Sequence, residues 1–295
     1  MAEANVSAPS DAETRAAAIS SASSVALYLC MYGAPVPCAD LNAAYWDIMP
    51  TVDYTTADRP YEDWKKNLYT ALAEINASGA GSKPKLVTGR APLTFMLQLG
   101  AALGVGTDVS FQPGNIALPC FGSVRAPRTY ASPPMVSYTY IPTAPLDPSM
   151  SGAEKGEAHL LFLGTVSRGG DFSRFGYRTI SVPENVQSVS AVCLDDDHVL
   201  TAETAEALCY QLETGINNAF AAIIANHGKG LEKLNLYVVS SLAGPLSMAA
   251  GLYLRKSVRP TCFPKVGLLD RVGVDYVSAG ELDYGIWRAS STTDA

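Results

Sequence analysis

Two stretches of this chain share one pattern, and that pattern limits the folds open to it. The first, "KLVTGRAPLTFMLQLGAALGVGTDVSF", begins at Lys85, and the second, "LNLYVVSSLAGPLSMAAGLYLRKSVRPTCF", begins at Leu234. Each has a short apolar strand, a turn with an Ala-Pro or Gly-Pro step, a helix of small and apolar residues, and another strand. Each also follows a long amphipathic helix, which favours an internal duplication over a chance likeness of two buried β-α-β units.

Two registers align these repeats. Matching the prolines places Pro92 on Pro245, whereas matching the helix glycines places Gly100 on Gly251, and the two choices differ by two residues. The duplication is therefore approximate, and both registers stay open at this point.

The second repeat also contains the one segment that a membrane could accommodate. Its uncharged part, 234–254, reaches the roughly 20 residues that a spanning helix needs. Ser240, Ser241, Gly244 and Pro245 interrupt it, however, and a strand, a turn and a helix fit all four residues better. Its apolarity then reflects burial on both faces of a sheet.

The rest of the chain alternates strands and helices, which predicts an α/β fold with two pseudo-symmetric Rossmann-like units and mainly parallel sheets. In the first half we expect a helix over 11–23, a strand from Val25, and an amphipathic helix that includes Trp64. In the second half we expect the strands "AHLLFLGTVS" and "VQSVSAVCL", a long helix capped by Thr201 and ended by Gly228, and a final strand "VRPTCF" at 258–263.

These patterns divide the chain into three parts. Residues 1–23 form an N-terminal extension, 24–156 a first unit with a proline-rich excursion over 113–156, and 157–295 a second unit. Long irregular excursions in compact folds are usually linkers or functional elements.

The charge balance excludes one class of partner. The chain has 21 Lys plus Arg against 28 Asp plus Glu, a formal net charge of -7. A protein that coats long nucleic acid is therefore not expected, although a small anionic ligand remains compatible with a locally positive site. The six cysteines form no CxxC pair and are predicted to be reduced core residues. The N-terminus lacks a secretory signal pattern, so we expect a cytoplasmic protein.

Candidate binding residues follow the strands. In an open parallel sheet, ligands bind at the carboxyl ends of strands, where helix N-termini favour anions. The residues there are Tyr32 and Gly33; Gly89, Arg90 and Pro92; Gly164, Ser167, Arg168, Gly169 and Gly170; and Ser240, Ser241 and Gly244. Arg90 stands between a strand and a helix, where a guanidinium can bind a phosphate through two hydrogen bonds. The alternative is an ordinary surface arginine.

Aromatic residues in predicted loops, Tyr32, Tyr45, Trp46 and Tyr130, are candidates for stacking on bases, against the more common alternative of packing.

Catalytic signals are weak. Ser240 and Ser241 lie outside a GxSxG elbow, and structural roles suffice for His159, His198 and His227. "DDDHV" at 195–199 is better explained as a solvated turn than as a divalent cation site, and "HGKGL" lacks the full phosphate-loop pattern. We therefore predict no catalytic residue, no metal and no cofactor.

The order of these segments resembles the SAVED domain, the second-messenger sensor of bacterial antiphage signalling systems (CBASS). That domain is built from two fused units similar to CRISPR-associated Rossmann-fold (CARF) domains. The resemblance rests on "GRAPLTFMLQLGAAL", "AHLLFLGTVS", the long helix from Thr201, and "LNLYVVSSLAGPLSMAAGLYL", which together span roughly residues 24–280. It implies two CARF-like units.

The resemblance also implies a ligand and a site. A member of this family binds a cyclic di-, tri- or tetranucleotide across the cleft between the halves. Carried to this chain, the matching positions are Gly89, Arg90 and Pro92 in one half and Ser240, Ser241, Gly244 and Pro245 in the other. Tyr32, Ser167 and Arg168 follow by their position at strand ends.

Ligand binding in this family commonly drives head-to-tail assembly that activates an effector carried on the same chain. About 24 residues precede the first strand here, so the chain is either a sensor with a separately encoded effector or a fragment.

The resulting hypothesis is a non-catalytic receptor that binds a cyclic oligonucleotide, forms a homo-oligomer or filament with it, and activates a partner effector in antiviral defence. Long nucleic acid and membranes are not expected as partners. One alternative is a phosphodiesterase of the ring-nuclease type, or another nucleotide-processing enzyme, for which the 195–198 turn or His159 would have to reach Ser240. The other is a structural or assembly protein that uses the 113–156 excursion as a contact arm.

Overall fold

A computed structural model gives the fold. It describes residues 22–30, 43–47, 61–112, 116–122, 136–141, 157–165, 180–181, 185–194, 199–257, 263–272 and 275–283. The elements of the first sheet and its helices are β1 (Ser24–Cys30), β2 (Ala43–Asp47), α2 (Tyr61–Ala77), β3 (Lys85–Arg90), α3 (Leu93–Leu103), β4 (Val109–Gln112) and β5 (Ile116–Ala117). Those of the second are β6 (Val136–Ile141), β7 (Glu157–Thr165), β8 (Ile180–Ser181), β9 (Asn185–Leu194), α5 (Ala205–His227), β10 (Leu234–Ser240), α6 (Gly244–Ser257), β11 (Val266–Val272) and β12 (Asp275–Glu281).

The two sheets repeat one topology. The first has the order β2-β1-β3-β4-β5, in which β4 and β5 pair antiparallel and the other pairs are parallel. The second contains the same arrangement as β9-β7-β10-β11-β12, with β6 and β8 added at its edges. Helices α2 and α3 flank β3 in the chain as α5 and α6 flank β10. The predicted α/β fold and its duplication are therefore confirmed.

The structure also decides the register of the repeat. Helix α3 begins at Leu93 and α6 at Gly244, which are 151 positions apart (244 − 93). Gly100 and Gly251 have the same separation (251 − 100). The proline register is wrong, because Pro92 is the N-cap of α3 whereas Pro245 is the second residue of α6. Proline is tolerated at both positions, since the first amides of a helix have no partner within it.

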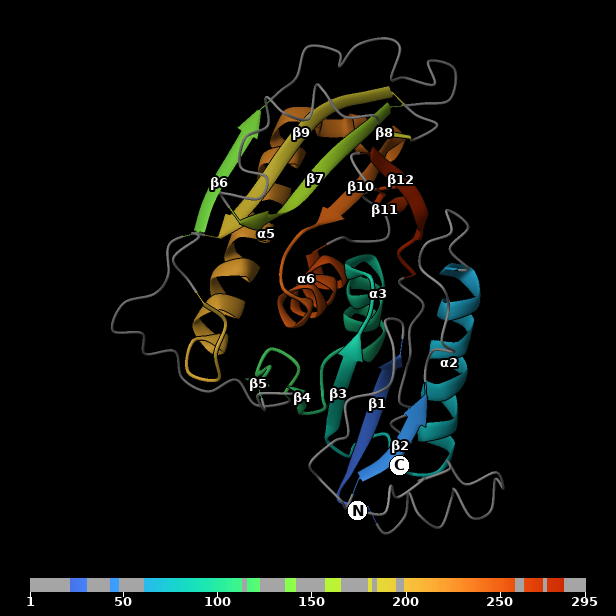
Figure 1. Ribbon diagram of the computed structural model, residues 1–295. Helices are drawn as coiled ribbons and strands as arrows, with labels where there is room; N and C mark the ends of the chain where they lie inside the picture. The colour runs from blue at the N-terminus through green and yellow to red at the C-terminus, as the bar shows by residue number, and fades with distance from the viewer. Residues whose placement is uncertain are drawn as a thin grey trace, which may run out of the picture.

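Helices α3 and α6 pack directly on each other between the two sheets (Figure 1). A Cβ added to Gly100 would lie 1.8 Å from the carbonyl oxygen of Met248, and one added to Gly251 would lie 1.9 Å from that of Leu97. Leu97 and Met248 are themselves 151 positions apart (248 − 97), so the two contacts are equivalent. The helices thus meet like the two halves of a symmetric dimer interface.

The same helices cross with like ends on the same side. Gly244, at the start of α6, lies against Met96 near the start of α3. At the other end, Arg255 Nη1 donates a hydrogen bond of 2.7 Å to the carbonyl oxygen of Ala101. The outer contacts bring the start of one helix to the start of the other and the end to the end, so the N-termini lie on the same side of the crossing point.

A continuous apolar core joins the two units. It includes Trp64 of α2, Leu97 of α3, Leu252 of α6 and Leu212 of α5. Cys120, Cys193 and Cys209 are buried and are not in disulfide bonds, as predicted for them. No helix in the described ranges is long and apolar enough to cross a membrane.

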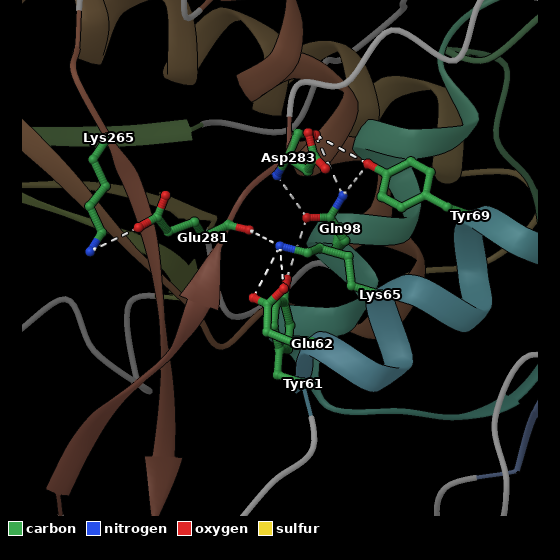
Figure 2. A network of polar contacts seen from close by, with 8 residues as sticks. All are labelled: Tyr61, Glu62, Lys65, Tyr69, Gln98, Lys265, Glu281 and Asp283. Carbon is green, nitrogen blue, oxygen red and sulfur yellow. Dashed lines mark hydrogen bonds and ion pairs between the residues drawn. The ribbon is translucent and has the colours of Figure 1, made fainter.

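A buried polar network also connects the first unit to the end of β12 (Figure 2). The amide of Gln98, which is fully buried on α3, pairs with the backbone of Asp283: Oε1 accepts from its N–H at 2.9 Å, and Nε2 donates to its carbonyl at 3.5 Å. Oε1 also accepts from the Tyr61 hydroxyl at 3.4 Å, and Nε2 donates to the Tyr69 hydroxyl at 3.0 Å. Every hydrogen-bonding position of this amide is therefore occupied.

Several local predictions need correction. Helix α5 begins at Ala205, because the hydroxyl of Thr201 accepts from the Thr204 N–H in a turn that precedes the helix. Gly228 ends the helix as predicted. Tyr45 and Trp46 belong to strand β2 and not to a loop. The strand that follows α6 in the sheet is β11, and most of the expected strand at 258–263 lies outside the described residues.

Two further predictions concern the N-terminal helix and the proline-rich excursion. The helix expected over 11–23 lies almost entirely outside the described residues. Strand β6, within the excursion assigned to the first unit, pairs antiparallel with β9 at the edge of the second sheet. The boundary at residue 157 stays a prediction.

Candidate functional site

The strongest candidate site lies where β3 leads into α3 and β10 leads into α6. Strands β3 and β10 are central in their sheets, because each pairs with parallel neighbours on both sides. Each loop starts at the carboxyl end of such a strand. Since the helix N-termini lie on the same side of the crossing point, the two loops lie on the same side of the α3–α6 layer. The positive ends of both helix dipoles lie there as well.

The first loop is shaped by its backbone. Gly89 has φ 102°, a conformation that disfavours other residues, and an added Cβ would lie 2.2 Å from the carbonyl oxygen of Leu29. The next residue, Arg90, is exposed, while Pro92 is buried. No side-chain hydrogen bond caps α3 at Pro92, so the first amides of this helix lack that partner.

Thr94, in the first turn of α3, is 1% exposed, and its hydroxyl oxygen is buried without a hydrogen-bond partner among the described residues. The sequence prediction did not include this residue. The available signal was a hydroxyl within the otherwise apolar "APLTFMLQLG".

The second loop is held by serines. The Ser240 and Ser247 hydroxyls are 2.9 Å apart, and Ser240 Oγ accepts from the Leu242 N–H at 3.3 Å. The Ser247 hydroxyl also donates to the Leu242 carbonyl at 3.3 Å. Ser240 therefore fixes the shape of the loop.

Ser241 differs from Ser240. Its N–H donates to the Leu163 carbonyl at 2.8 Å, which extends the pairing of β10 with β7. Its hydroxyl lies over Gly164, where an added Cβ would be 2.4 Å from Oγ. Like that of Thr94, this hydroxyl is buried and has no hydrogen-bond partner in the described part of the chain. A buried hydroxyl without a hydrogen-bond partner costs about 1–3 kcal/mol of folding free energy. We therefore expect each of the two hydroxyls to have a functional role.

The predicted residues divide into two groups. The seven described ones, Gly89, Arg90, Pro92, Ser240, Ser241, Gly244 and Pro245, lie at these two loops and helix starts. Tyr32, Ser167 and Arg168 lie outside the described residues, as do Tyr130 and residues 195–198. The binding role of all ten predicted residues stays a prediction.

His159 belongs to a separate cluster. It is fully buried between the hydroxyls of Ser188 and Ser190, each 2.6 Å from a ring nitrogen, and Ser188 also contacts His227 at 3.0 Å. Burial, with a smaller effect of His227, lowers the pKa of His159 to about 3. This imidazole is therefore neutral at physiological pH.

The position of His159 separates it from the candidate site. Its partner across β7 and β10 is Leu236, whereas the partner of Ser240 is Leu163. Four residues of strand correspond to about 13 Å, so His159 does not reach Ser240 as an acid or base. No group of three or more His, Cys, Asp or Glu side chains that could hold a metal occurs in the searched, described ranges.

Comparison with known proteins identifies the fold. No protein-family model and no curated protein matches the sequence. Among solved structures, the SAVED/CARF-domain containing receptor Cap4 of Acinetobacter baumannii with the cyclic trinucleotide 2'3'3'-cAAA has a TM-score of 0.56 and 14% identity, over 89% of this chain and 52% of that chain. The same receptor with 3'3'3'-cAAA has a TM-score of 0.53 and 14% identity over the same shares.

The chain thus spans about half the length of these receptors. The predicted resemblance to the SAVED domain is confirmed at the level of the fold.

Proposed function

We propose that this chain, whose fold is that of SAVED/CARF-domain receptors, is a non-catalytic receptor for a cyclic oligonucleotide of two to four nucleotides. The ligand would bind at the junction of the β3–α3 and β10–α6 loops. One observation carries this proposal: a buried hydroxyl without a hydrogen-bond partner among the described residues lies in the first turn of α3, at Thr94, and another lies in the β10–α6 loop, at Ser241. A ligand with several phosphates can accept hydrogen bonds from both.

The residues have distinct proposed roles. Arg90, exposed at the end of β3, would bind a phosphate by charge. Thr94 and Ser241 would donate their hydroxyls. Gly89, Pro92, Gly244 and Pro245 would shape the loops, as Ser240 does through its contact with Ser247. Tyr32, Ser167 and Arg168 remain proposed contacts from neighbouring strand ends.

The first experiment is a binding screen. The protein is mixed with cyclic di-, tri- and tetranucleotides, its Tm is measured, and the ligand is recovered and quantified. Binding at 100 times Kd adds about 2.7 kcal/mol to the free energy of unfolding, which shifts Tm by several degrees. No shift with any member refutes the receptor function. Loss of the ligand would instead favour the alternative of a phosphodiesterase.

Substitutions then locate the site. Thr94→Val and Ser241→Ala remove a buried hydroxyl without a partner, so the free protein should be as stable as before or more stable, whereas ligand affinity should fall. Arg90→Ala should weaken binding without unfolding the protein. Lys66→Ala, which removes an exposed charge from α2, is the matched control and should bind normally. Unchanged affinity in all three site variants would place the ligand elsewhere.

The proposed partners follow from the same function. A separately encoded effector would respond to a ligand-induced homo-oligomer or filament, with no role for long nucleic acid or a membrane. Light scattering with and without the bound cyclic nucleotide tests this assembly. A constant mass in the presence of saturating ligand would contradict it.

A further inference from the structure

A chain of hydrogen bonds joins strands β9 and β7 to the end of helix α5, away from the proposed ligand site. It runs from Ser190 through His159 and Ser188 to His227. The Ser190 and Ser188 hydroxyls lie 2.6 Å from Nε2 and Nδ1 of His159, and Ser188 Oγ lies 3.0 Å from His227 Nε2. Ser190 and His159 are fully buried, while His227 is half-buried. The chain thus leads from the interior of the sheet toward the surface.

The number of protons allows this chain only two directions. A neutral imidazole has one N–H and one bare nitrogen, and each hydroxyl has one proton to donate. In the outward direction, Ser190 donates to His159 Nε2 and His159 Nδ1–H donates to Ser188, whose own proton goes to His227 Nε2. In the inward direction, His227 Nε2–H donates to Ser188 and Ser188 donates to His159 Nδ1. The N–H of His159 is then on Nε2 and faces Ser190.

The Ser190 hydroxyl decides between the two directions. It has no second hydrogen-bond partner among the described residues, so its proton is used only when it goes to His159 Nε2. The inward direction leaves this proton buried without an acceptor, which is unfavourable. While His227 is neutral, the chain therefore runs outward, and His159 carries its proton on Nδ1. The hydrogen bond at one ring nitrogen thus sets the state of the other.

We propose that protonation of His227 reverses this chain and moves the proton of the buried His159 from Nδ1 to Nε2. A protonated imidazole has two N–H groups and cannot accept a hydrogen bond at Nε2. Its Nε2–H must then donate to Ser188, and the Ser188 proton must turn to His159 Nδ1, so that only Nε2 of His159 can carry a proton. One proton is gained in total, by His227, and the other three residues keep one each.

His159 itself stays neutral during this change. Burial, with a smaller effect of His227, lowers the pKa of His159 to about 3, far below the pH at which histidine side chains usually gain a proton. The two histidines are close, with ring centres 6.1 Å apart, so a second positive charge beside the first is unfavourable as well. The response of His159 is therefore a change of tautomer and not of charge.

Charged residues on the surrounding elements do not replace this contact. His227 forms no ion pair within the part of the chain that the structure describes. Strands β5, β6 and β9, which lie against α5, contain no charged residue. The charged residues of the other neighbouring elements are Glu157 in β7, Lys229, Glu232 and Lys233 in the turn η3 (Gly228–Lys233), and Arg255 and Lys256 in α6.

The chain makes the sheet interior sensitive to a charge near the surface. In the reversed state the Ser190 proton loses its acceptor, and both bonds of Ser188 change direction. The oxygen and nitrogen atoms need not move for this, because every contact has a donor and an acceptor in either direction. Acid therefore changes the hydrogen bonding between β7 and β9 without a change of fold.

The test follows the ring nitrogens of the native protein by 15N NMR between about pH 8 and pH 5, the range in which histidine side chains gain a proton. Through-bond correlations assign the signals, and a bare ring nitrogen is distinguished from an N–H nitrogen by its chemical shift. At pH 8 the bare nitrogen of His159 should be Nε2. As His227 gains its proton, the bare nitrogen of His159 should become Nδ1 in the same proportion.

Two variants separate the chain from a general effect of pH. Ser188→Ala removes the link to His227, so His159 should keep its proton on Nδ1 at every pH in the range. Ser110→Ala, which removes a hydroxyl from β4 of the first sheet, is the matched control and should show the normal exchange. A normal exchange in Ser188→Ala would contradict the proposed path.

Two results on the unaltered chain would overturn the proposal, and they hold even if a variant fails to fold. In one, His159 carries its proton on Nε2 at pH 8, which would mean that Ser190 does not set the direction. In the other, the proton stays on Nδ1 while His227 becomes charged, which would mean that Ser188 does not connect the two rings.

Discussion

A methyl group on Gly100 tests the reciprocal packing of α3 and α6. The added Cβ would lie 1.8 Å from the Met248 carbonyl oxygen, and real Cβ contacts essentially never fall below 3.0 Å, so the helices must separate by at least 1.2 Å (3.0 − 1.8). Backbone atoms cannot rotate away, which places the cost at the upper end of the overpacking range, about 3 kcal/mol. Alanine regains about 1 kcal/mol of helix propensity. Gly100→Ala should therefore destabilise the protein by about 2 kcal/mol, and Gly251→Ala by a similar amount.

The double variant gives the sharper result. The two glycines contact equivalent carbonyls across the same pair of helices, so one separation relieves both clashes. The packing cost of about 3 kcal/mol then counts once, while the propensity gain of about 1 kcal/mol counts twice. The double variant should lose about 1 kcal/mol, less than either single variant.

Urea unfolding followed by tryptophan fluorescence measures these differences, since Trp64 is buried in the shared core. Gly244→Ala is the control, because its added Cβ would lie 3.4 Å from the flexible end of Met96 and should cost below about 0.5 kcal/mol. If the double variant loses the sum of the two single losses, the helices do not separate as one body and the reciprocal contact is refuted.

Two further predictions concern buried polar groups. The pKa of His159 is about 3 in the folded protein and 6.5 in an unfolded chain. The contribution of the neutral imidazole to stability is therefore full above pH 6.5 and is lost as the pH falls toward 3. The free energy of unfolding should fall by about 2 kcal/mol between pH 6.5 and 5, and His159→Gln should remove this loss in urea titrations; equal losses in both proteins would contradict it. Gln98→Leu leaves the Asp283 backbone and the Tyr69 hydroxyl without their partner, so it should cost about 3 kcal/mol against about 1 kcal/mol for Tyr69→Phe. Similar losses for the two variants would show that Gln98 contributes no more than one ordinary hydrogen bond.

The duplication could be predicted because each repeat has its strand, turn and helix in local sequence. The register could not be decided in the same way. Gly100 and Gly251 mark the close approach of two helices, which is a requirement of packing, whereas Pro92 and Pro245 only need a position near a helix start. The glycines therefore indicate the register of the repeat, and the prolines do not.

The remaining features depend on contacts between distant segments. Gln98 pairs with Asp283, 185 positions away, and no local pattern indicates that partner. The buried hydroxyls of Thr94 and Ser241 are distinctive only because the fold leaves them without a hydrogen bond. In the candidate site, the sequence predicted which strand ends lead into α3 and α6, and it did not indicate Thr94. The binding role of Pro92 and Pro245, which are buried, stays a prediction.

The register of the repeat has one more consequence. At the shift of 151 positions, Arg90 of the first loop corresponds to Ser241 of the second (241 − 90). Two copies of one polypeptide would have to present the same side chain on both sides, but a chain that carries both copies is free of that rule. The candidate site is therefore asymmetric at this pair of positions, with the cation of Arg90 in the first loop and the hydroxyl of Ser241 in the second. If the proposed ligand binds there, we expect it to have one preferred orientation, because turning it end for end would exchange unlike neighbours.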